Sequence, residues 1–289
     1  MTELAFTRVA VIGAGTMGAG IAQVCAQAGA DTTLNDISDE FVQRGLGTIT
    51  RFLDKGVEKG KVTEDARAST LDRIRTDTDL AAAVSDADLV IEAVPEKLEL
   101  KNDVFLRVAK SCGDAAVLAT NTSSLSLRGV FADVPHSDRC IGMHFFNPVP
   151  IMKLLEIVRL ESTDASVLDR VRTFAGQLGK EPIVVKDSPG FATSRLGVCL
   201  GLEAIRMLEA GVASAEDIDK AMELGYRHPM GPLKLTDLVG LDVRLAIADY
   251  LDGELDSPAF AAPDLMREMV KRGELGQKSG RGFYDWRAD

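Results

Sequence analysis

The segment Val9-Ala-Val-Ile-Gly13-Ala-Gly15-Thr-Met-Gly18 constrains the fold of this chain more than any other. Its apolar residues 9–12 are typical of a short buried strand, and the glycine-rich turn after them leads into a helix predicted over 16–29. A glycine motif alone is a weak signal. With a strand before it and a helix after it, such a turn is typical of the start of a βαβ unit that binds a dinucleotide.

The residues of this turn have separate physical roles in binding a dinucleotide. Gly13 permits the tight turn, Gly15 lets the pyrophosphate approach the backbone, and Gly18 lets helix and strand pack closely. The first N–H groups of the helix point at the phosphates. We therefore predict a cofactor-binding loop made of Gly13, Gly15, Thr16, Met17 and Gly18.

The second predicted strand, 31–36, ends on Asp36, and this favours NAD as the cofactor. A carboxylate at this position accepts hydrogen bonds from ribose hydroxyl groups. The next residue is Ile37, so no arginine follows directly to receive the 2′-phosphate of NADP. FAD in place of NAD, and a glycine turn without a ligand, are the alternatives that the residues leave open.

Strands and helices alternate as far as residue 186, which predicts an α/β domain with a mostly parallel, Rossmann-type sheet. The further predicted strands are 74–76, 89–93, 117–120, 140–143, 153–158 and 183–186, and the longer helices are 39–60, 63–71, 97–111 and 164–179. After Asp187-Ser-Pro-Gly190 only helical periodicity remains. We therefore predict a nucleotide-binding domain over 1–186 and an all-helical domain over 187–289.

The bulk properties exclude several classes of protein. The 289 residues are enough for one large α/β domain and a smaller second one. The 33 basic and 44 acidic residues give a net charge of −11, which argues against nucleic-acid binding. The four cysteines lack the spacing of a metal site and are typical of core residues in a reducing compartment. No segment resembles a signal peptide or a membrane span, so we expect a cytoplasmic protein without a bound metal.

The segment Gly142-Met-His144-Phe-Phe-Asn147-Pro148, with Glu156 twelve residues after the histidine, contains the candidate acid/base group. An imidazole is a suitable proton acceptor for an alcohol oxidised near neutral pH, and a carboxylate on its other nitrogen would set the tautomer. His144 follows a predicted strand, at the sheet edge where ligands bind in open α/β folds. From the residues alone, a structural role for His144 in the core or on the surface is as good an explanation as a catalytic one. Glu156 would either face the edge of the sheet or pair with another side chain.

The segment Asn121-Thr-Ser123-Ser-Leu follows the predicted strand 117–120 and has two interpretations. Its hydroxyl groups can contact a ligand, or they can cap a helix that begins near residue 125. The residues alone favour the cap, because asparagine, serine and threonine are preferred at helix N-termini.

Six motifs along the chain resemble, in order, those of the L-3-hydroxyacyl-CoA dehydrogenases. They are Gly13-Ala-Gly-Thr-Met-Gly-Ala-Gly20, Glu92-Ala-Val-Pro-Glu96, Asn121-Thr-Ser-Ser-Leu125, Gly142-Met-His-Phe-Phe-Asn-Pro148, Lys186-Asp-Ser-Pro-Gly-Phe191 and Gly280-Arg-Gly-Phe-Tyr284. The resemblance covers essentially the whole chain. It implies an enzyme that uses NAD to oxidise a short-chain L-3-hydroxyacyl-CoA, such as 3-hydroxybutyryl-CoA, or to reduce the 3-ketoacyl form.

The resemblance also implies roles for individual side chains. His144 would take the proton of the 3-hydroxyl group while C3 passes a hydride to the nicotinamide. Glu156 would orient His144 and balance its charge, and Ser123 would bind the reacting oxygen. These three residues and Ser194 are the expected catalytic group.

Other residues match family positions that contact the cofactor. Glu96, Lys101 and Asn147 would line its nicotinamide-ribose side, and Lys278, in the C-terminal Gln-Lys-Ser-Gly, would also touch it. For Lys101 the alternative is a solvated lysine on a helix.

Ser194 departs from the family pattern. It precedes Arg195, where the family usually carries an asparagine whose amide holds the substrate oxygen near C3. Serine keeps a hydrogen-bond donor but is shorter, and a bridging water would have to fill the gap. We therefore expect Ser194 to contact substrate and to support weaker binding or turnover than an asparagine.

For the coenzyme A part, the resemblance points to Lys59, which belongs to a basic cluster near the end of the helix predicted over 39–60. The cluster is Arg51, Lys55, Lys59 and Lys61. A solvated helix face is the alternative, because acidic residues are interspersed.

Apolar residues at helical spacing in the C-terminal domain imply a surface to be buried. They are Leu196, Leu200, Ala204, Met207 and Leu208. This face would pack against the nucleotide-binding domain or, as in the family's usual homodimer, against a second copy.

Other functions stay open at this point. The closest is a related dehydrogenase that acts on a hydroxyacyl group held by a carrier protein, or on a free hydroxy acid. A non-catalytic NAD-binding protein is the alternative from another class. The presence of His144 and Glu156 argues against it, whereas Ser194 slightly favours it.

Overall fold

The structure is a computed structural model that describes residues 3–287. The chain divides into two compact units, with the division between Ser188 and Pro189. This division lies two residues beyond the predicted one. The first unit is an α/β domain and the second is all-helical, so the predicted fold class is confirmed.

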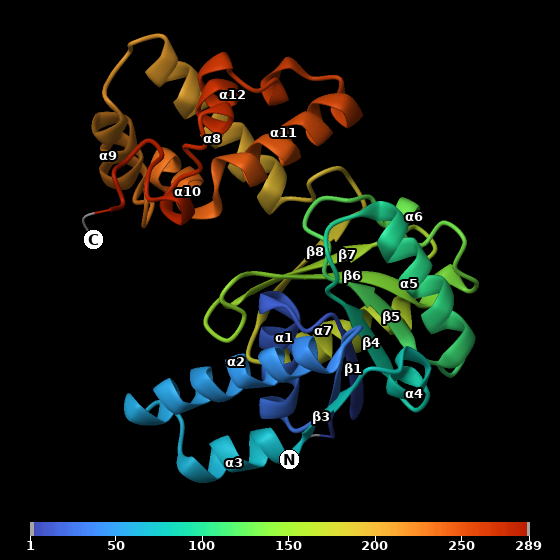
Figure 1. Ribbon diagram of the computed structural model, residues 1–289. Coiled ribbons are helices and arrows are strands. Elements are labelled where there is room, and N and C mark those ends of the chain that lie inside the picture. Colours follow the sequence, from blue (N-terminus) through green and yellow to red (C-terminus); the bar gives the residue numbers. More distant parts are fainter. Residues whose placement is uncertain (1–2, 288–289) are drawn as a thin grey trace. The chain divides into compact units, whose positions relative to one another are not determined.

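An eight-stranded sheet forms the centre of the first unit (Figure 1). Its strands are β1 (Arg8–Ile12), β2 (Asp31–Asn35), β3 (Ile74–Asp77), β4 (Leu89–Glu92), β5 (Val117–Thr120), β6 (Cys140–Phe145), β7 (Leu154–Arg159) and β8 (Glu181–Lys186). The spatial order is β3-β2-β1-β4-β5-β6-β7-β8, and every neighbouring pair is parallel except β6 and β7. The predicted Rossmann-type sheet is therefore confirmed.

Helices cover both faces of this sheet (Figure 1). They are α1 (Thr16–Ala28), α2 (Asp39–Glu58), α3 (Glu64–Asp72), α4 (Leu80–Val84), α5 (Leu98–Ser111), α6 (Leu127–Val130) and α7 (Ala165–Gln177), with a 3₁₀ turn, η1 (Ser137–Arg139). Alternate strand residues such as Val9 and Val11 join α1 and α7 in one apolar core, because successive strand side chains point to opposite faces. Helices α4, α5 and α6 lie on the other face.

The antiparallel pairing of β6 and β7 places His144 directly opposite Glu156. We predicted that His144 follows a strand ending at residue 143, but β6 continues to Phe145, so His144 lies within the strand. Ile141, Met143 and Phe145 point into the core shared with α1 and α7. The His144 side chain therefore projects from the other face, and its register partner Glu156 projects beside it.

The second unit consists of helices around its own apolar core (Figure 1). They are α8 (Thr193–Glu209), α9 (Ala215–Tyr226), α10 (Pro232–Val239), α11 (Leu241–Leu255) and α12 (Asp264–Lys271), with the 3₁₀ turns η2 (Pro258–Phe260) and η3 (Gln277–Ser279). Val198, Leu202 and Ile205 of α8 form the centre of this core. Their spacing is that of one face of a helix.

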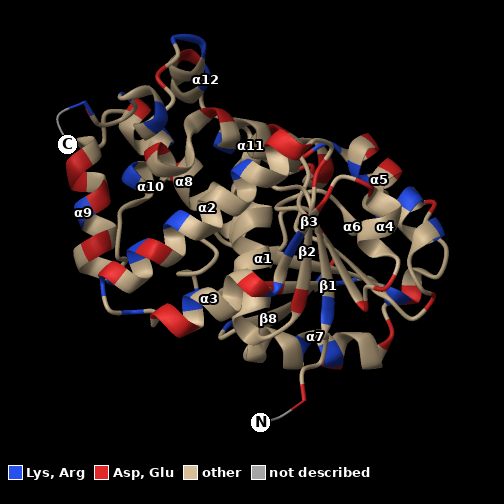
Figure 2. Ribbon diagram, turned by 60° about the horizontal axis from the view of Figure 1, so that its bottom comes forward, with Lys and Arg blue, Asp and Glu red and all other residues tan. Residues whose placement is uncertain are grey.

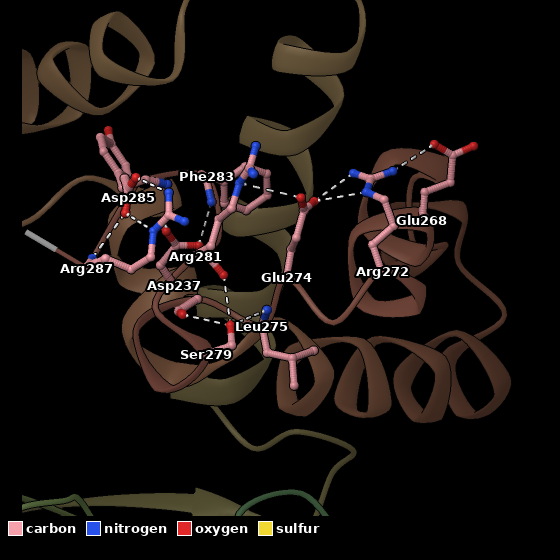
Figure 3. Close-up of polar contacts among 12 residues, drawn as sticks. Asp237, Glu268, Arg272, Glu274, Leu275, Ser279, Arg281, Phe283, Asp285 and Arg287 are labelled. Atoms are coloured by element: carbon pink, nitrogen blue, oxygen red, sulfur yellow. Dashed lines mark hydrogen bonds and ion pairs between the residues drawn. The ribbon is translucent and has the colours of Figure 1, made fainter.

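The C-terminal segment of the second unit is anchored by the buried carboxylate of Asp237 (Figure 3). One carboxylate oxygen accepts a hydrogen bond from the Phe283 N–H at 2.9 Å. The other accepts from the Tyr284 N–H and from the indole Nε1 of Trp286, both at 2.9 Å. Burial raises the pKa of Asp237, and these three donors oppose that rise by stabilising the charged form. The Gly280–Tyr284 motif therefore has a structural explanation.

We predict that Asp237→Asn lowers the free energy of unfolding of this unit by about 2–4 kcal/mol, because its amide cannot accept all three bonds and leaves donors unpaired. Trp286 is the single tryptophan, so its emission should shift to the red and its unfolding midpoint should fall in urea titrations. The control is Asp285→Asn, whose exposed carboxylate bonds Arg287. Equal urea unfolding midpoints for Asp237→Asn and Asp285→Asn would contradict the assignment of Asp237 as the anchor of the C-terminal segment.

The described residues hold neither a membrane span nor a metal cluster. Among residues 3–287, no helix combines the length and the apolar character needed to cross a membrane. In the same residues, no group of three or more histidine, cysteine or acidic side chains is placed to hold a metal ion. The thiols of Cys25 and Cys140 are buried, and burial raises the pKa of each to about 12.

Candidate active site

The glycine turn has the geometry that a dinucleotide loop requires. Gly13 has a φ of +101° and its N–H donates to the Asn35 carbonyl at 2.8 Å. A side chain at Gly18 would overlap the Gly13 carbonyl oxygen, so this contact demands glycine. At Gly15, by contrast, an added Cβ would meet nothing within 4 Å. The backbone at Gly15 is therefore open to a ligand.

A pocket of 630 Å³ lies beside this turn, at the carboxyl ends of β1 and β2. Its walls include Gly13, Gly15, Thr16, Met17 and Asp36. The Asp36 carboxylate accepts hydrogen bonds at 2.7 Å from the N–H groups of Ala14 and Ile37, so it is held at the rim of the turn. The open glycine backbone, the first turn of α1 and a fixed carboxylate fit a dinucleotide such as NAD.

The pocket wall also contains Arg44 and Arg107, which are not among the site residues predicted from the sequence. The Arg44 guanidinium lies over the ring of Phe41, 4.7 Å from its centroid. We considered only the residue directly after Asp36 as a basic group for the cofactor. Phe41 and Arg44 are three residues apart and therefore share one face of the helix, and this spacing is the sequence signal that could have indicated their contact.

We predict that Gly15→Ala reduces the affinity for NADH by about ten- to a hundredfold while leaving the unfolding midpoint nearly unchanged. The added methyl group would occupy the space where the pyrophosphate approaches the backbone. Gly18→Ala is the matched comparison and should instead destabilise the fold, because its methyl group meets the Gly13 carbonyl. Fluorescence titration with NADH and urea unfolding separate the two effects. If Gly15→Ala bound NADH as tightly as the wild type, the assignment of the glycine turn as the dinucleotide-binding loop would be wrong.

A buried ion pair joins the end of β4 to α5. The Lys101 ammonium, with a side chain only 1 % exposed, lies 2.7 Å from Glu92 and 3.2 Å from Glu96. Glu92 is fully buried and also accepts from Thr120 Oγ1 at 2.6 Å. Burial raises the pKa of Glu92, and the Lys101 charge opposes this rise. Lys101 is therefore not a solvated helix lysine, and that alternative is wrong.

Glu96 connects this ion pair to the loop that carries Ser123. Its carboxylate accepts hydrogen bonds from Thr122 Oγ1 at 2.5 Å and from the Ser123 N–H at 2.9 Å. The Asn121 side chain accepts from the Phe145 N–H at 2.9 Å, next to His144. The loops after β4, β5 and β6 are thus tied together by side-chain bonds.

The predicted helix cap by the Asn121–Ser123 segment is wrong. Helix α6 begins at Leu127, and its N–H groups are capped by the Asp187 carboxylate at 2.9 Å and 3.0 Å. Thr122 Oγ1 accepts from the Leu125 N–H at 3.1 Å, which forms a local turn instead. Asp187 lies some 60 residues further along the chain, so local sequence contains no sign of this cap.

His144 and Glu156 form a buried pair. Nδ1 of the imidazole lies 2.7 Å from Oε2 of the carboxylate. Glu156 is 0 % exposed and His144 is 5 % exposed, and the imidazole also packs against the Phe146 ring with centroids 4.5 Å apart. A carboxylate on Nδ1 fixes the ring orientation and directs proton exchange to Nε2.

The loop after β6 carries Asn147 towards the first turn of α1. Asn147 and Thr16 line the same small pocket of 70 Å³. The buried Lys180 ammonium donates to the Val149 carbonyl at 2.5 Å and to the Met152 carbonyl at 2.8 Å. Burial lowers the pKa of Lys180. Lys180 was not among the predicted site residues, yet it fixes the loop that positions Asn147.

Three predicted site residues lie outside this group. Lys59 is exposed at the end of α2, where acidic and basic side chains are mixed (Figure 2). Lys278 and Ser194 belong to the second unit, where Lys278 pairs with Asp242 at 2.5 Å. Ser194 lies in the first turn of α8 and is half-buried.

Two family models match the two units of the chain. Residues 8–188 match the NAD-binding domain of 3-hydroxyacyl-CoA dehydrogenase, and residues 190–286 match its C-terminal domain. The chain belongs to the 3-hydroxyacyl-CoA dehydrogenase family. As a member of this family it is an NAD-dependent oxidoreductase.

Relatives in this family match nearly the full length of the chain. A 3-hydroxybutyryl-CoA dehydrogenase of Mycobacterium tuberculosis is 44 % identical, over 98 % of this chain and 99 % of the relative. The mitochondrial hydroxyacyl-coenzyme A dehydrogenase of Rattus norvegicus is 40 % identical, over 99 % and 93 %. The crystal structure of (S)-3-hydroxybutyryl-CoA dehydrogenase from Ralstonia eutropha matches with a TM-score of 0.94 and 43 % identity, over 97 % and 99 %.

Proposed function

We propose that this member of the family interconverts short-chain L-3-hydroxyacyl-CoA and 3-ketoacyl-CoA, with 3-hydroxybutyryl-CoA as a substrate. The observation that carries the proposal is the buried His144–Glu156 pair, 2.7 Å apart. It lies in the sheet whose β1 end bears the dinucleotide loop. The names of the relatives support the short acyl chain.

The side chains of the first unit divide the chemistry between them. NAD, when bound, accepts the hydride from C3 of the substrate. Nε2 of His144 takes the proton of the 3-hydroxyl group, and Glu156 holds Nδ1–H and balances the positive charge that forms on the ring. Ser123 binds the reacting oxygen. In the reverse direction His144 returns the proton to that oxygen.

The surrounding bonds keep these groups in place. Glu96 holds the Ser123 backbone, and Asn121 holds the strand next to His144. We assign cofactor contacts to Gly13, Gly15, Thr16, Met17, Gly18, Asp36, Glu96 and Asn147. Lys101 acts on this site through Glu96, because its ammonium is enclosed by two carboxylates. We also propose Lys278 as a cofactor contact, and its ammonium would then leave or share its ion pair with Asp242.

Binding of coenzyme A and dimerisation belong to this proposal as well. Lys59 and the exposed basic side chains near it would meet the phosphates of coenzyme A. The second unit would form a homodimer, because Leu196, Val239 and Val243 expose apolar surface that a second copy would bury. We propose the cytoplasm as the location of the protein. Sedimentation at several protein concentrations tests the dimer.

Oxidation of NADH, followed at equal concentrations of three acceptors, tests the function. The acceptors are acetoacetyl-CoA, acetoacetyl-pantetheine and free acetoacetate. We expect the highest kcat/KM with acetoacetyl-CoA. A preference for pantetheine would favour a carrier-protein substrate, and a preference for acetoacetate would favour a free acid. No turnover of any acceptor, with NADH still bound, would favour a non-catalytic NAD-binding protein.

We predict that Ser194→Asn raises kcat/KM for acetoacetyl-CoA by about ten- to a hundredfold, because the longer amide supplies an oriented donor to the substrate oxygen. Loss of one such donor costs about 2.7–4 kcal/mol in a strong case. Ser194→Ala should lower kcat/KM further and serves as the comparison. An unchanged kcat/KM in Ser194→Asn would remove the reason to place this residue at the substrate.

A further inference from the structure

Arg244, on α11 of the second unit, is a buried cation that has no counter-ion among the residues that the structure describes. The residue is only 8 % exposed, and its Nε is buried without a hydrogen-bond acceptor. No carboxylate of residues 3–287 lies within ion-pair distance of the guanidinium. A buried charge of this kind is unfavourable unless it is paired. The guanidinium therefore favours an anionic partner, which residues 3–287 do not supply.

The acidic side chains of neighbouring segments are already engaged. Asp242, two residues earlier on α11, pairs with Lys278 at 2.5 Å. Asp237 on α10 accepts three hydrogen bonds from the C-terminal segment. Glu203 on α8 pairs with Arg206 at 3.1 Å. Asp242 and Glu203 therefore have other cations as ion-pair partners, and Asp237 binds the C-terminal segment.

The guanidinium lies against two glycines of α8. A Cβ built on Gly197 would lie 3.4 Å from Nη1 of Arg244, and one built on Gly201 would lie 3.7 Å from it. Gly197 and Gly201 are four residues apart and so share one face of the helix. With glycine at both positions, these two residues place no side chain over the guanidinium.

Ser194 lies on the same face of α8, three residues before Gly197. Along the helix axis, Gly197 and Gly201 are roughly 4.5 Å and 10.5 Å beyond Ser194. A substrate whose C3 oxygen is bound at Ser194 would therefore need only a few more carbons to bring a terminal group to Arg244. This step rests on the proposed function, which places the reacting part of the acyl chain at Ser194.

We propose that Arg244 binds a carboxylate at the far end of the substrate's acyl chain. The preferred substrates of this enzyme are then CoA thioesters of short dicarboxylic 3-hydroxy or 3-keto acids. A planar guanidinium is suited to bidentate binding of a carboxylate. Burial lowers the pKa of Arg244 to about 10, so the group is still charged at neutral pH. An incoming carboxylate would thus meet a poorly hydrated positive charge.

A matched pair of acceptors isolates the terminal carboxylate. The pair is 3-oxohexanoyl-CoA and the mono-CoA thioester of 3-oxohexanedioic acid. The acyl chain ends in a methyl group in the first compound and in a carboxylate in the second, and the two are otherwise identical. We expect the wild type to prefer the dicarboxylic thioester by about ten- to a hundredfold in kcat/KM. Arg244→Met should abolish or reverse this preference, and Arg244→Lys should retain part of it. Arg267→Met, which removes an exposed arginine paired with Asp249, is the control and should keep it.

Binding measurements separate this proposal from the proposed function. Calorimetric titration with hexanoyl-CoA and hexanedioyl-CoA, which lack the reacting oxygen, needs no turnover. A preference for hexanedioyl-CoA that disappears in Arg244→Met would support the site even if no acceptor is reduced. Equal values of kcat/KM and of Kd for the two members of each pair in the wild type would overturn the proposal. It would also be overturned if Arg244→Met turned a dimer into a monomer and left a wild-type preference unchanged, since the guanidinium would then pair with a second copy.

Discussion

His144→Ala should lower kcat for the reduction of acetoacetyl-CoA by about 10²- to 10⁴-fold, the range that a positioned general acid/base contributes. Alanine removes the group that carries the proton to and from the C3 oxygen. The dinucleotide pocket, with Asp36 and the glycine turn, is lined by other residues, so the Kd for NADH should stay within about a factor of three. The measurement is a steady-state NADH oxidation assay combined with a fluorescence titration of NADH.

The matched control for this variant is His228→Ala, in the turn after α9, which should retain nearly full activity. Circular dichroism of both variants checks that the sheet is intact. If His144→Ala kept more than about a tenth of the wild-type kcat, another residue would have to supply the proton. The central assignment would then be wrong.

Glu156→Gln should lower kcat by about 10²- to 10⁴-fold, although it changes only one atom of the side chain. A neutral amide opposite Nδ1 cannot balance an imidazolium and can hold the ring in the wrong tautomer. The stability of the fold should change little, because the remaining imidazole can stay neutral and no unpaired charge is left in the core. We expect an unfolding midpoint close to that of the wild type, measured by circular dichroism in urea.

A double variant makes this second prediction sharper. If Glu156 acts only through His144, then His144→Ala combined with Glu156→Gln should be no slower than His144→Ala alone. Additive losses would show that Glu156 acts on the substrate or cofactor by another route. The matched control is Glu181→Gln, on the edge strand β8, where the side chain is exposed and lies 3.9 Å from Lys153.

Much of the first unit could be predicted from local patterns. The strand over 8–12, the helix after the glycine turn and the strand ending near Asp36 lie where the sequence places them. Hydrophobic periodicity reports which residues a segment buries, and glycine marks positive φ, so both signals are local. The candidate site was only partly predictable, because its geometry depends on residues that meet through the sheet.

The pairing of His144 and Glu156 shows where the local signal ends. Twelve residues of separation are compatible with many arrangements, and only the antiparallel register of β6 and β7 brings the two side chains together. Lys101 is a similar case. A lysine on a polar helix is usually solvated, but here Glu92, at the end of β4, draws its ammonium into the interior.

The sequence alone was sufficient to predict the alternation of strands and helices from periodicity and the nucleotide loop from its glycine turn. It was also sufficient for the family resemblance, because each of the motifs consists of residues close together in the chain. Which carboxylate meets which cation was decided by the folded structure. Asp187 caps α6 across about 60 residues, Asp237 anchors the segment 283–286, and no acid among residues 3–287 pairs with Arg244. Such electrostatic pairs form between segments that only packing brings within a few ångströms, and the energy of a charge depends on the burial that this packing creates.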